Sequence, residues 1–323
     1  MMTADSSHQQ AQVSRAIVVC DQAQTAASLN QTTDLMAAIA QASREYECGA
    51  ILSPERMVVA LRDGGVLLSM PATANDISIH KLVNVQPANA RRHLPTIHGI
   101  VTVCDSATGK PLCLLDGPEV TGRRTAAVSL LAIKTFLPCA PTEALLIGTG
   151  MQAAYHLRAF AEVHPKCKVW VRGMDLETAQ AFCLANHAVH RDLQACEPTV
   201  VPENVHVIIT LTTATHPVYN EAARAGRLLI GVGAFKPEMA ELGKVTLDGS
   251  DIYADDPKGA QHEAGDLLQA GIDWTRVASL AWALQNRPDL SRPIVFKSVG
   301  TGAWDLAASR VALKSLGLDR LEV

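Results

Sequence analysis

The sequence predicts an α/β fold in which a doubly wound, Rossmann-type domain is joined to a mixed α+β domain. Three observations support this: the chain has 323 residues, hairpin and short-strand signals dominate residues 15–115, and strands alternate with helices from residue 144 onward. A chain of this length exceeds what one hydrophobic core normally organises. We therefore expect the mixed domain at residues 1–122, joined by a C-terminal helix within 304–323, and the Rossmann-type domain at 123–303.

The Rossmann-type domain is predicted from short apolar segments that alternate with longer helical patterns. This order is typical of a doubly wound sheet. The helices expected between its first strands lie at 151–163 and 176–186. The expected strands are residues 144–147, 169–171, 205–210, 228–232, 251–254 and 294–297.

The mixed domain is predicted to begin with a helix at 32–48 and to continue in hairpins. Strands at 57–61 and 66–70 flank Asp63-Gly64-Gly65, a sequence that tolerates the positive φ of a tight turn. A second hairpin is expected from residues 97–104 and 111–115. The segment between them, 78–85, alternates, so that Lys81 falls on an otherwise apolar face. An ammonium in such a row is a candidate functional group.

A long Ala- and Leu-rich helix is predicted at 123–137, bridging the two domains. Thr121 can cap its first turn, and Pro138 stops it. This placement puts Arg124 in the first turn, where free N–H groups and the helix dipole favour an anion. A last helix is expected at 304–316, packing back on the first domain.

Composition excludes several classes of protein. A net charge of −4, with Lys and Arg evenly scattered, argues against nucleic acid. No run approaches the 18 apolar residues of a membrane span, and residues 1–14 do not resemble a signal peptide. The eight cysteines are widely spaced, which favours reduced thiols in the cytoplasm over a disulfide framework or a metal site. We therefore expect no metal, no nucleic acid and no membrane.

The motif Gly148-x-Gly150-x-x-Ala153 follows a predicted strand and opens a helix, the context expected of a dinucleotide site. The first glycine permits the turn, the second lets the backbone approach the pyrophosphate, and the alanine permits close packing. A plain glycine turn is the alternative. The cofactor-binding residues expected are Gly148, Thr149, Gly150, Met151, Gln152 and Ala153, with Thr212 and Thr213 at a later strand end.

The end of the second strand of this domain bears on the choice of cofactor. An acidic residue there would bind the ribose 2′-hydroxyl of NAD, but the chain has Arg172. A guanidinium suits a 2′-phosphate. We therefore predict NADPH, with NADH possible. An arginine stacked on the adenine, compatible with either cofactor, is the alternative.

Several motifs in order resemble the ornithine cyclodeaminase/μ-crystallin family. They are the segments 81–89, 94–96, 108–117 and 121–127, together with the glycine motif. The resemblance runs from about residue 56 to 306, and it implies a homodimer with a substrate carboxylate held between the domains beside the nicotinamide. The substrate contacts that it implies, by match to the motifs of the family, are Arg56, Lys81, Thr96 and Arg124.

Independent chemistry supports the basic residues of this set. Arginine binds a carboxylate with two parallel hydrogen bonds, and lysine offers a point charge. Arg56 read alone could also be an ordinary surface arginine at a strand start. The segment Gly300-Thr301-Gly302 is expected to close over the nicotinamide and to bring Thr301 to the substrate, unless it is a plain loop.

The chain departs from the cyclodeaminase pattern at Phe235. Cyclodeaminases have an aspartate there that assists ring closure, whereas an aromatic side chain makes a drier pocket. The Gly-Ala-Phe-x-Pro-Glu-Met form resembles the ketimine reductase branch of the family. That resemblance implies hydride transfer to C2 of a protonated cyclic imine, Δ1-pyrroline-2-carboxylate or Δ1-piperideine-2-carboxylate, giving L-proline or L-pipecolate. Lys81 is the candidate catalytic acid.

Three other functions remain as alternatives. Ornithine cyclodeaminase is disfavoured by Phe235, and an alanine dehydrogenase of the same fold would need a site for ammonia. A non-catalytic, NADPH-binding μ-crystallin-like protein would have no need of the charged residues Arg56, Lys81 and Arg124. Exposed strands in the first domain are consistent with a sheet-mediated homodimer.

Overall fold

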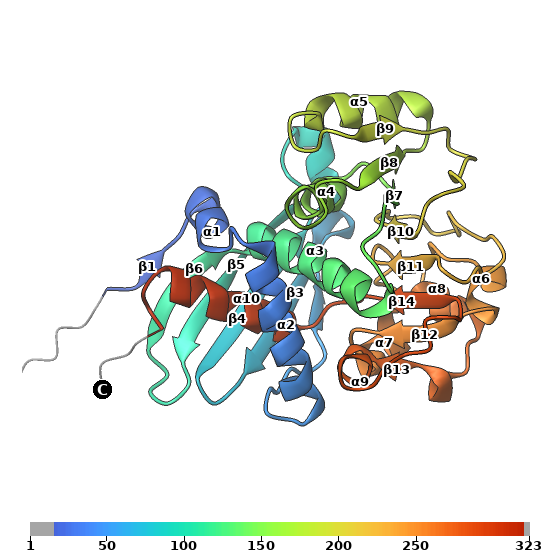
Figure 1. Ribbon diagram of the computed structural model, residues 1–323. Coiled ribbons are helices and arrows are strands. Elements are labelled where there is room, and N and C mark those ends of the chain that lie inside the picture. Colours follow the sequence, from blue (N-terminus) through green and yellow to red (C-terminus); the bar gives the residue numbers. More distant parts are fainter. Residues whose placement is uncertain (1–15, 320–323) are drawn as a thin grey trace, which may run out of the picture.

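The computed structural model describes residues 16–319, which form two sheets with helices packed around them (Figure 1). The first sheet is mixed and has the strand order β1-β6-β5-β4-β3-β2, in which only β1 and β6 are parallel. Its strands are β1 (Val18–Val19), β2 (Met57–Ala60), β3 (Val66–Thr73), β4 (Ile77–Val85), β5 (Ile97–Asp105) and β6 (Pro111–Asp116). Helices α1 (Gln22–Ser28), α2 (Thr32–Glu47) and α10 (Gly302–Ser315) accompany it.

The second sheet is wholly parallel and has the order β13-β12-β14-β11-β10-β7-β8-β9. Its strands are β7 (Glu143–Ile147), β8 (Lys168–Arg172), β9 (Leu193–Ala195), β10 (Val207–Thr210), β11 (Leu228–Gly231), β12 (Asp251–Ala254), β13 (Ala278–Ser279) and β14 (Ile294–Lys297). The helices of this half are α4 (Met151–Val163), α5 (Leu176–Asn186), α6 (Lys244–Asp248), α7 (Pro257–Glu263), α8 (Gly265–Ala270) and α9 (Leu280–Gln285).

The predicted α/β fold class, a Rossmann-type domain with a mixed α+β domain, is confirmed. The chain leaves β7 toward β8 and β9 on one side, then returns to β10 and β11 on the other. Between β7 and β10 the winding therefore reverses, which opens a crevice at the carboxyl ends of these strands. Gly148 and Leu211 directly follow the two strands, so the glycine motif lies at this crevice.

Helix α3 (Gly117–Phe136) lies between the two sheets and contacts α2, α4 and α10 (Figure 1). It begins earlier than predicted, because Asp116 caps it: the Asp116 carboxylate accepts a hydrogen bond of 2.7 Å from the Glu119 N–H. The prediction that Thr121 caps this helix is wrong. Most of the helix is buried, as expected for an element covered on several sides.

The remaining predictions differ from the structure mainly at element ends and in short elements. The hairpin through Asp63 is present, with φ of +55° at that residue. α10 contacts β3 and β4, as expected of a helix that returns to the first sheet. The predicted domain limit at 122/123 falls inside α3, and the division into domains stays a prediction. Residues 1–15 and 320–323 lie outside the described part of the chain. Among the described residues, 16–319, no helix is long and apolar enough to span a bilayer.

Candidate active site

The turn between β7 and α4 has the backbone shape that a dinucleotide site requires. Gly148 has φ of +124°, and a Cβ there would lie 2.7 Å from the Leu211 carbonyl oxygen. Gly150 is the N-cap of α4, and a Cβ there would meet nothing within 4 Å. Ala153 is fully buried against the core. The amino end of α4 therefore faces open space, where its free N–H groups and its dipole favour phosphate.

One buried carboxylate holds the two strand ends that face this turn. Glu241 accepts hydrogen bonds from the Thr210 hydroxyl and from the Thr212 N–H and hydroxyl, at 2.9, 2.6 and 2.8 Å. It also accepts from the N–H groups of Gly233 and Ala234, at 2.6 and 3.1 Å. Five bonds from two loops fix the backbone after β10 and β11, because each buried donor would otherwise be unsatisfied. Thr212 and its neighbour Thr213 are thereby held at the crevice.

A cavity of about 310 Å³ joins the crevice to the first sheet; we call it the central cavity. Most of its wall is apolar, with Phe235 from the loop after β11 and Ile97 from β5 among the lining side chains. Three cationic side chains also reach it: Arg56, Lys81 and Arg124. The crevice residues in its wall are Gly150, Met151, Gln152, Thr212 and Thr213. Predicted substrate and cofactor residues, from distant parts of the sequence, thus meet in one small cavity.

Lys81 lies on the buried face of β4, and its side chain is 3% exposed. Its Nζ lies 2.6 Å from Oδ2 of Asp305 on α10, and 3.5 Å from the Thr121 hydroxyl. Burial lowers the pKa of Lys81, the Asp305 carboxylate raises it, and Arg124 and Arg56 lower it. The net result is a pKa of about 8. A pKa this close to neutrality suits a group that donates a proton.

Arg124 shares the same aspartate. Its Nε lies 3.2 Å from Asp305 Oδ1, and its guanidinium packs against Gly300, where a Cβ would lie 2.7 Å from Nη1. Because α3 begins at Gly117, Arg124 lies more than one turn inside the helix. The predicted stabilisation of an anion by the helix terminus at this residue is therefore wrong. The positive charge that Arg124 brings to the central cavity comes from its side chain and not from the terminus of α3.

Arg56 is not an ordinary surface arginine. Its side chain is 13% exposed, and its Nη2 donates to the carbonyl oxygens of Val299 and Gly300 at 3.0 and 2.7 Å. The same nitrogen lies 2.6 Å from Glu263 Oε2. These contacts hold the guanidinium against the loop that follows β14, so that it closes one side of the central cavity.

A family model supplies the decisive comparison. The model of the ornithine cyclodeaminase/mu-crystallin family matches residues 17–316. The chain belongs to this family. The glycine turn, the three cations and the apolar cavity therefore lie within a match that spans nearly the whole chain.

Two relatives in sequence and one solved structure are similar to this chain over most of its length. The Delta(1)-pyrroline-2-carboxylate/Delta(1)-piperideine-2-carboxylate reductase of Azospirillum brasilense is 50% identical over 304 residues, which cover 94% of this chain and 97% of that protein. Ketimine reductase mu-crystallin of Mus musculus is 31% identical over 87% of this chain and 90% of its own. The structure of Thermococcus litoralis Delta(1)-pyrroline-2-carboxylate reductase in complex with NADH and L-proline gives a TM-score of 0.82 at 24% identity, covering 93% of this chain and 97% of that one.

Two predicted substrate contacts lie outside the central cavity: Thr96, implied by the family resemblance, and Thr301, predicted from the loop after the last strand. Thr96 is exposed, and its neighbour Ile97 lines the cavity instead. Thr301 caps α10, and its hydroxyl lies 2.8 Å from that of Ser53, on the side of the loop away from the central cavity. Ser298 and Val299, from the same loop, line the cavity in its place. A shift of a few residues along a loop turns a side chain to the other face, which sequence spacing alone does not reveal.

Arg172 is also placed differently from the prediction. It ends β8 as expected, but its side chain is buried and Nη2 donates to the Val218 carbonyl oxygen. Burial lowers the pKa of Arg172. The guanidinium is thus directed inward, toward the loop after β10, rather than toward the position expected of a 2′-phosphate. In this arrangement Arg172 does not favour NADPH over NADH.

Asp305 and Glu241 are the site residues that the sequence predictions missed. Both are fully buried, and both organise residues that line the central cavity. A charged residue within the apolar helix α10 is a signal that could have drawn attention to Asp305. For Glu241 the signal is weaker, because it lies in a loop whose partners are backbone groups of other loops.

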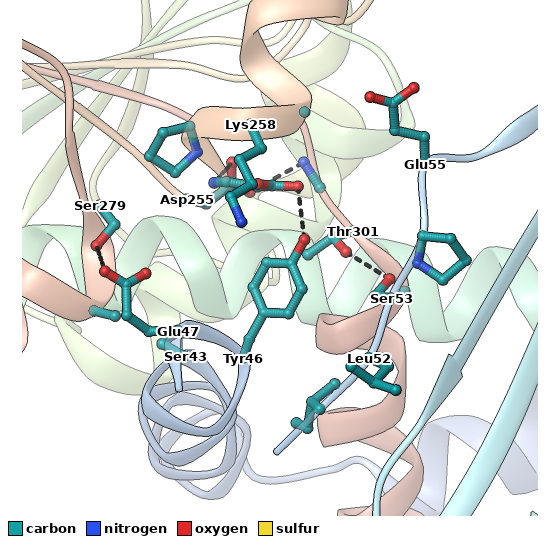
Figure 2. Close-up of a pocket in the computed structure, with 18 of the residues that line it drawn as sticks. Ser43, Tyr46, Glu47, Leu52, Ser53, Glu55, Asp255, Lys258, Ser279 and Thr301 are labelled. Carbon is teal, nitrogen blue, oxygen red and sulfur yellow. Dashed lines mark hydrogen bonds between the residues drawn. The ribbon is translucent and has the colours of Figure 1, made fainter. Parts of the chain in front are cut away.

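A second cavity of about 820 Å³, which we call the lateral cavity, has Tyr46, Asp255 and Thr301 among its lining residues (Figure 2). The end of α2 and the loops after β12, β13 and β14 contribute to its wall. Its polar groups pair with each other: the Tyr46 hydroxyl donates to Asp256 at 3.3 Å, and the Ser279 hydroxyl to Glu47 at 3.1 Å. Arg56 lines both cavities, and its partner Glu263 lines the lateral cavity.

The raised pKa of Glu263 predicts that the stability of the protein depends on pH. Burial raises its pKa from 4.5 to about 7, despite the neighbouring Arg56. Above pH 7 the carboxylate is charged in the folded protein at a cost of about 3 kcal/mol, a cost that disappears as the pH falls below the unfolded pKa of 4.5. We therefore expect Glu263→Gln to stabilise the protein by up to about 3 kcal/mol at pH 8.5, and to have little effect at pH 4.5.

Denaturant unfolding of the wild type and Glu263→Gln at both pH values measures this difference. Glu238→Gln, at an exposed side chain in the loop after β11, is the matched control and is expected to change stability by no more than about 0.5 kcal/mol at either pH. A gain from Glu263→Gln that is independent of pH would contradict the prediction.

Proposed function

We propose that the protein is an NAD(P)H-dependent reductase of cyclic ketimine carboxylates. It converts Δ1-pyrroline-2-carboxylate to L-proline and Δ1-piperideine-2-carboxylate to L-pipecolate. The observation that best supports this activity is that Lys81, Arg56 and Arg124 line the same small cavity as Phe235. This cavity opens on the glycine turn before α4. Relatives named as reductases of these imines, with identity near 50%, support the same activity.

The residues present fit the cofactor. Gly150 leaves the space above the amino end of α4 free for the pyrophosphate, and Thr212 and Thr213 line the path from there to the central cavity. The bound dihydronicotinamide supplies the hydride. Since Arg172 is turned inward, we propose that both NADH and NADPH serve, and that the predicted preference for NADPH depends on Arg172 reorienting.

The side chains of the chain itself have three tasks in this reaction. Arg124 and Arg56 provide the positive charge that holds the substrate carboxylate. Phe235 and the apolar wall exclude water and restrict the substrate ring to one orientation. Lys81 Nζ donates a proton to the imine nitrogen, because a protonated imine accepts hydride at C2 far more readily.

Phe235 separates this reaction from the deamination of ornithine. A cyclodeaminase requires a carboxylate near the substrate amine, whereas the position that the family pattern aligns with it is Phe235, whose side chain lines the cavity. Asp305 is the nearby buried carboxylate, but both its oxygens face cations. A free carboxylate for that chemistry is therefore absent among the described residues that line the cavity.

The test is a spectrophotometric assay of the purified protein at 340 nm with NADH or NADPH. The two cyclic imines are each compared with pyruvate plus ammonia and with ornithine. We expect cofactor oxidation with the cyclic imines alone. Release of ammonia from ornithine, or oxidation with pyruvate and ammonia only, would replace this proposal by cyclodeaminase or alanine dehydrogenase activity.

We further propose that the protein is a cytoplasmic homodimer formed through the first sheet. The edge strand β2 exposes Met57, Val58 and Val59, and β5 exposes Ile97 and Ile100. An exposed apolar sheet surface of this kind usually binds another protein surface. Sedimentation equilibrium should give about twice the 34.4 kDa chain mass; a monomer at micromolar concentration would contradict the proposal.

A further inference from the structure

We propose that Asp305 is the positioning residue of the active site. It holds Lys81 and Arg124 at the substrate and leaves one uncompensated positive charge for the carboxylate of the substrate. This inference rests on the proposed function. Asp305 is fully buried on α10, with Oδ2 2.6 Å from Lys81 Nζ and Oδ1 3.2 Å from Arg124 Nε. A single carboxylate thus joins a strand of the first sheet to the bridging helix.

Asp305 offsets one of the positive charges around the central cavity. Arg56 is paired with Glu263, whereas Lys81 and Arg124 share Asp305. Two cations and one anion leave a net charge of one in a nearly dry site. Buried charge is costly unless it is neutralised, so the remaining cation is matched to a monoanionic substrate. Without Asp305 the empty site would contain two unpaired cations.

Asp305 also controls the proton on Lys81. The groups that face Lys81 are Asp305 from α10, Arg124 from α3 and Arg56 from the segment before β2. Asp305 is the one among them that raises the pKa of Lys81; burial and both arginines lower it. Removing its charge therefore favours neutral Lys81, which has no proton to donate at the imine nitrogen.

The experiment is Asp305→Asn, which retains shape and removes charge. Turnover of Δ1-pyrroline-2-carboxylate is expected to fall about 100-fold, because a misplaced reacting group costs about that much. KM for the imine should not rise, because the net positive charge of Lys81, Arg124 and residue 305 is not reduced by the substitution, whether or not Lys81 keeps its proton. In the wild type, we expect kcat to fall as the pH rises through about 8, the pKa of Lys81. In Asp305→Asn that fall should begin at a lower pH, while NAD(P)H affinity stays unchanged.

Asp266→Asn is the matched control. Asp266 is as deeply buried as Asp305 and lies 3.2 Å from Lys297 Nζ, but it does not line the central cavity. The same substitution there removes an equally buried carboxylate from a lysine. It is expected to lower the melting temperature without moving the alkaline limb of the pH profile. An equal shift in both variants, or an unshifted limb with near-normal kcat in Asp305→Asn, would overturn the proposal.

A double-mutant cycle keeps the proposal testable if Asp305→Asn folds poorly. The Lys81→Met/Asp305→Asn variant leaves one unpaired cation instead of two. If Asp305 acts on turnover through Lys81, this variant and Lys81→Met should have the same kcat within about twofold. A further 100-fold loss would show that Asp305 acts independently and would reject the assignment. Since wild-type imine reduction is measured first, its absence would disprove the proposed function separately.

Discussion

Replacing Lys81 by methionine is expected to lower kcat for the cyclic imines by about 10²- to 10⁴-fold, the usual contribution of a positioned proton donor. Methionine fills a similar volume on the buried face of β4, and Asp305 retains Arg124 as its partner. NAD(P)H affinity should remain unchanged, because Lys81 lies on the first sheet, away from the glycine turn. Steady-state kinetics and fluorescence titration of the cofactor measure the two effects.

Lys297→Met provides the control for this prediction. Lys297 is fully buried and pairs with Asp266, so its replacement likewise removes a buried ammonium from a buried carboxylate. We expect it to reduce stability and to have a much smaller effect on kcat. Near-normal kcat/KM in Lys81→Met would reject Lys81 as the proton donor.

Replacing Gly150 by valine is expected to weaken NAD(P)H binding at least about 100-fold while leaving the fold intact. A Cβ at Gly150 meets nothing within 4 Å, and its φ is −84°, which any residue adopts. The added methyl groups therefore enter only the space predicted for the pyrophosphate. The melting temperature without cofactor should match the wild type, and the stabilisation by added cofactor should be lost.

Gly148→Ala distinguishes this blockage from a damaged fold. Gly148 has φ of +124°, and its Cβ would contact the Leu211 carbonyl at 2.7 Å, so backbone strain accompanies the loss of binding. This variant should lose melting temperature even without cofactor. If Gly150→Val binds NAD(P)H normally, the pyrophosphate does not lie at the amino end of α4.

Much of the architecture could be predicted because it depends on local patterns. The alternation of apolar residues placed Lys81 on the buried face of β4. The Gly148-x-Gly150-x-x-Ala153 spacing placed the turn at the crevice between β7 and β10. Short elements such as α6, α7, α8 and α9 were not predicted, since a few residues carry too little periodicity to identify a helix.

Errors in the predicted site arose where a side chain's partner lies far away in the sequence. Thr121 is a good capping residue, but Asp116 at the end of β6 caps α3 first. Arg172 ends its strand as predicted, yet a carbonyl 46 residues later draws it inward. The Thr301 hydroxyl is hydrogen-bonded to that of Ser53 in the wall of the lateral cavity.

The sequence by itself determined the family, the doubly wound sheet with its glycine turn, and the basic residues that reach the cavity. These properties depend on residue type and spacing along the chain. Only the tertiary structure showed that Asp305, 224 residues after Lys81 and 181 after Arg124, lies between them. The physical reason is that electrostatic energy depends on distance in space and on burial, neither of which is encoded by spacing along one segment.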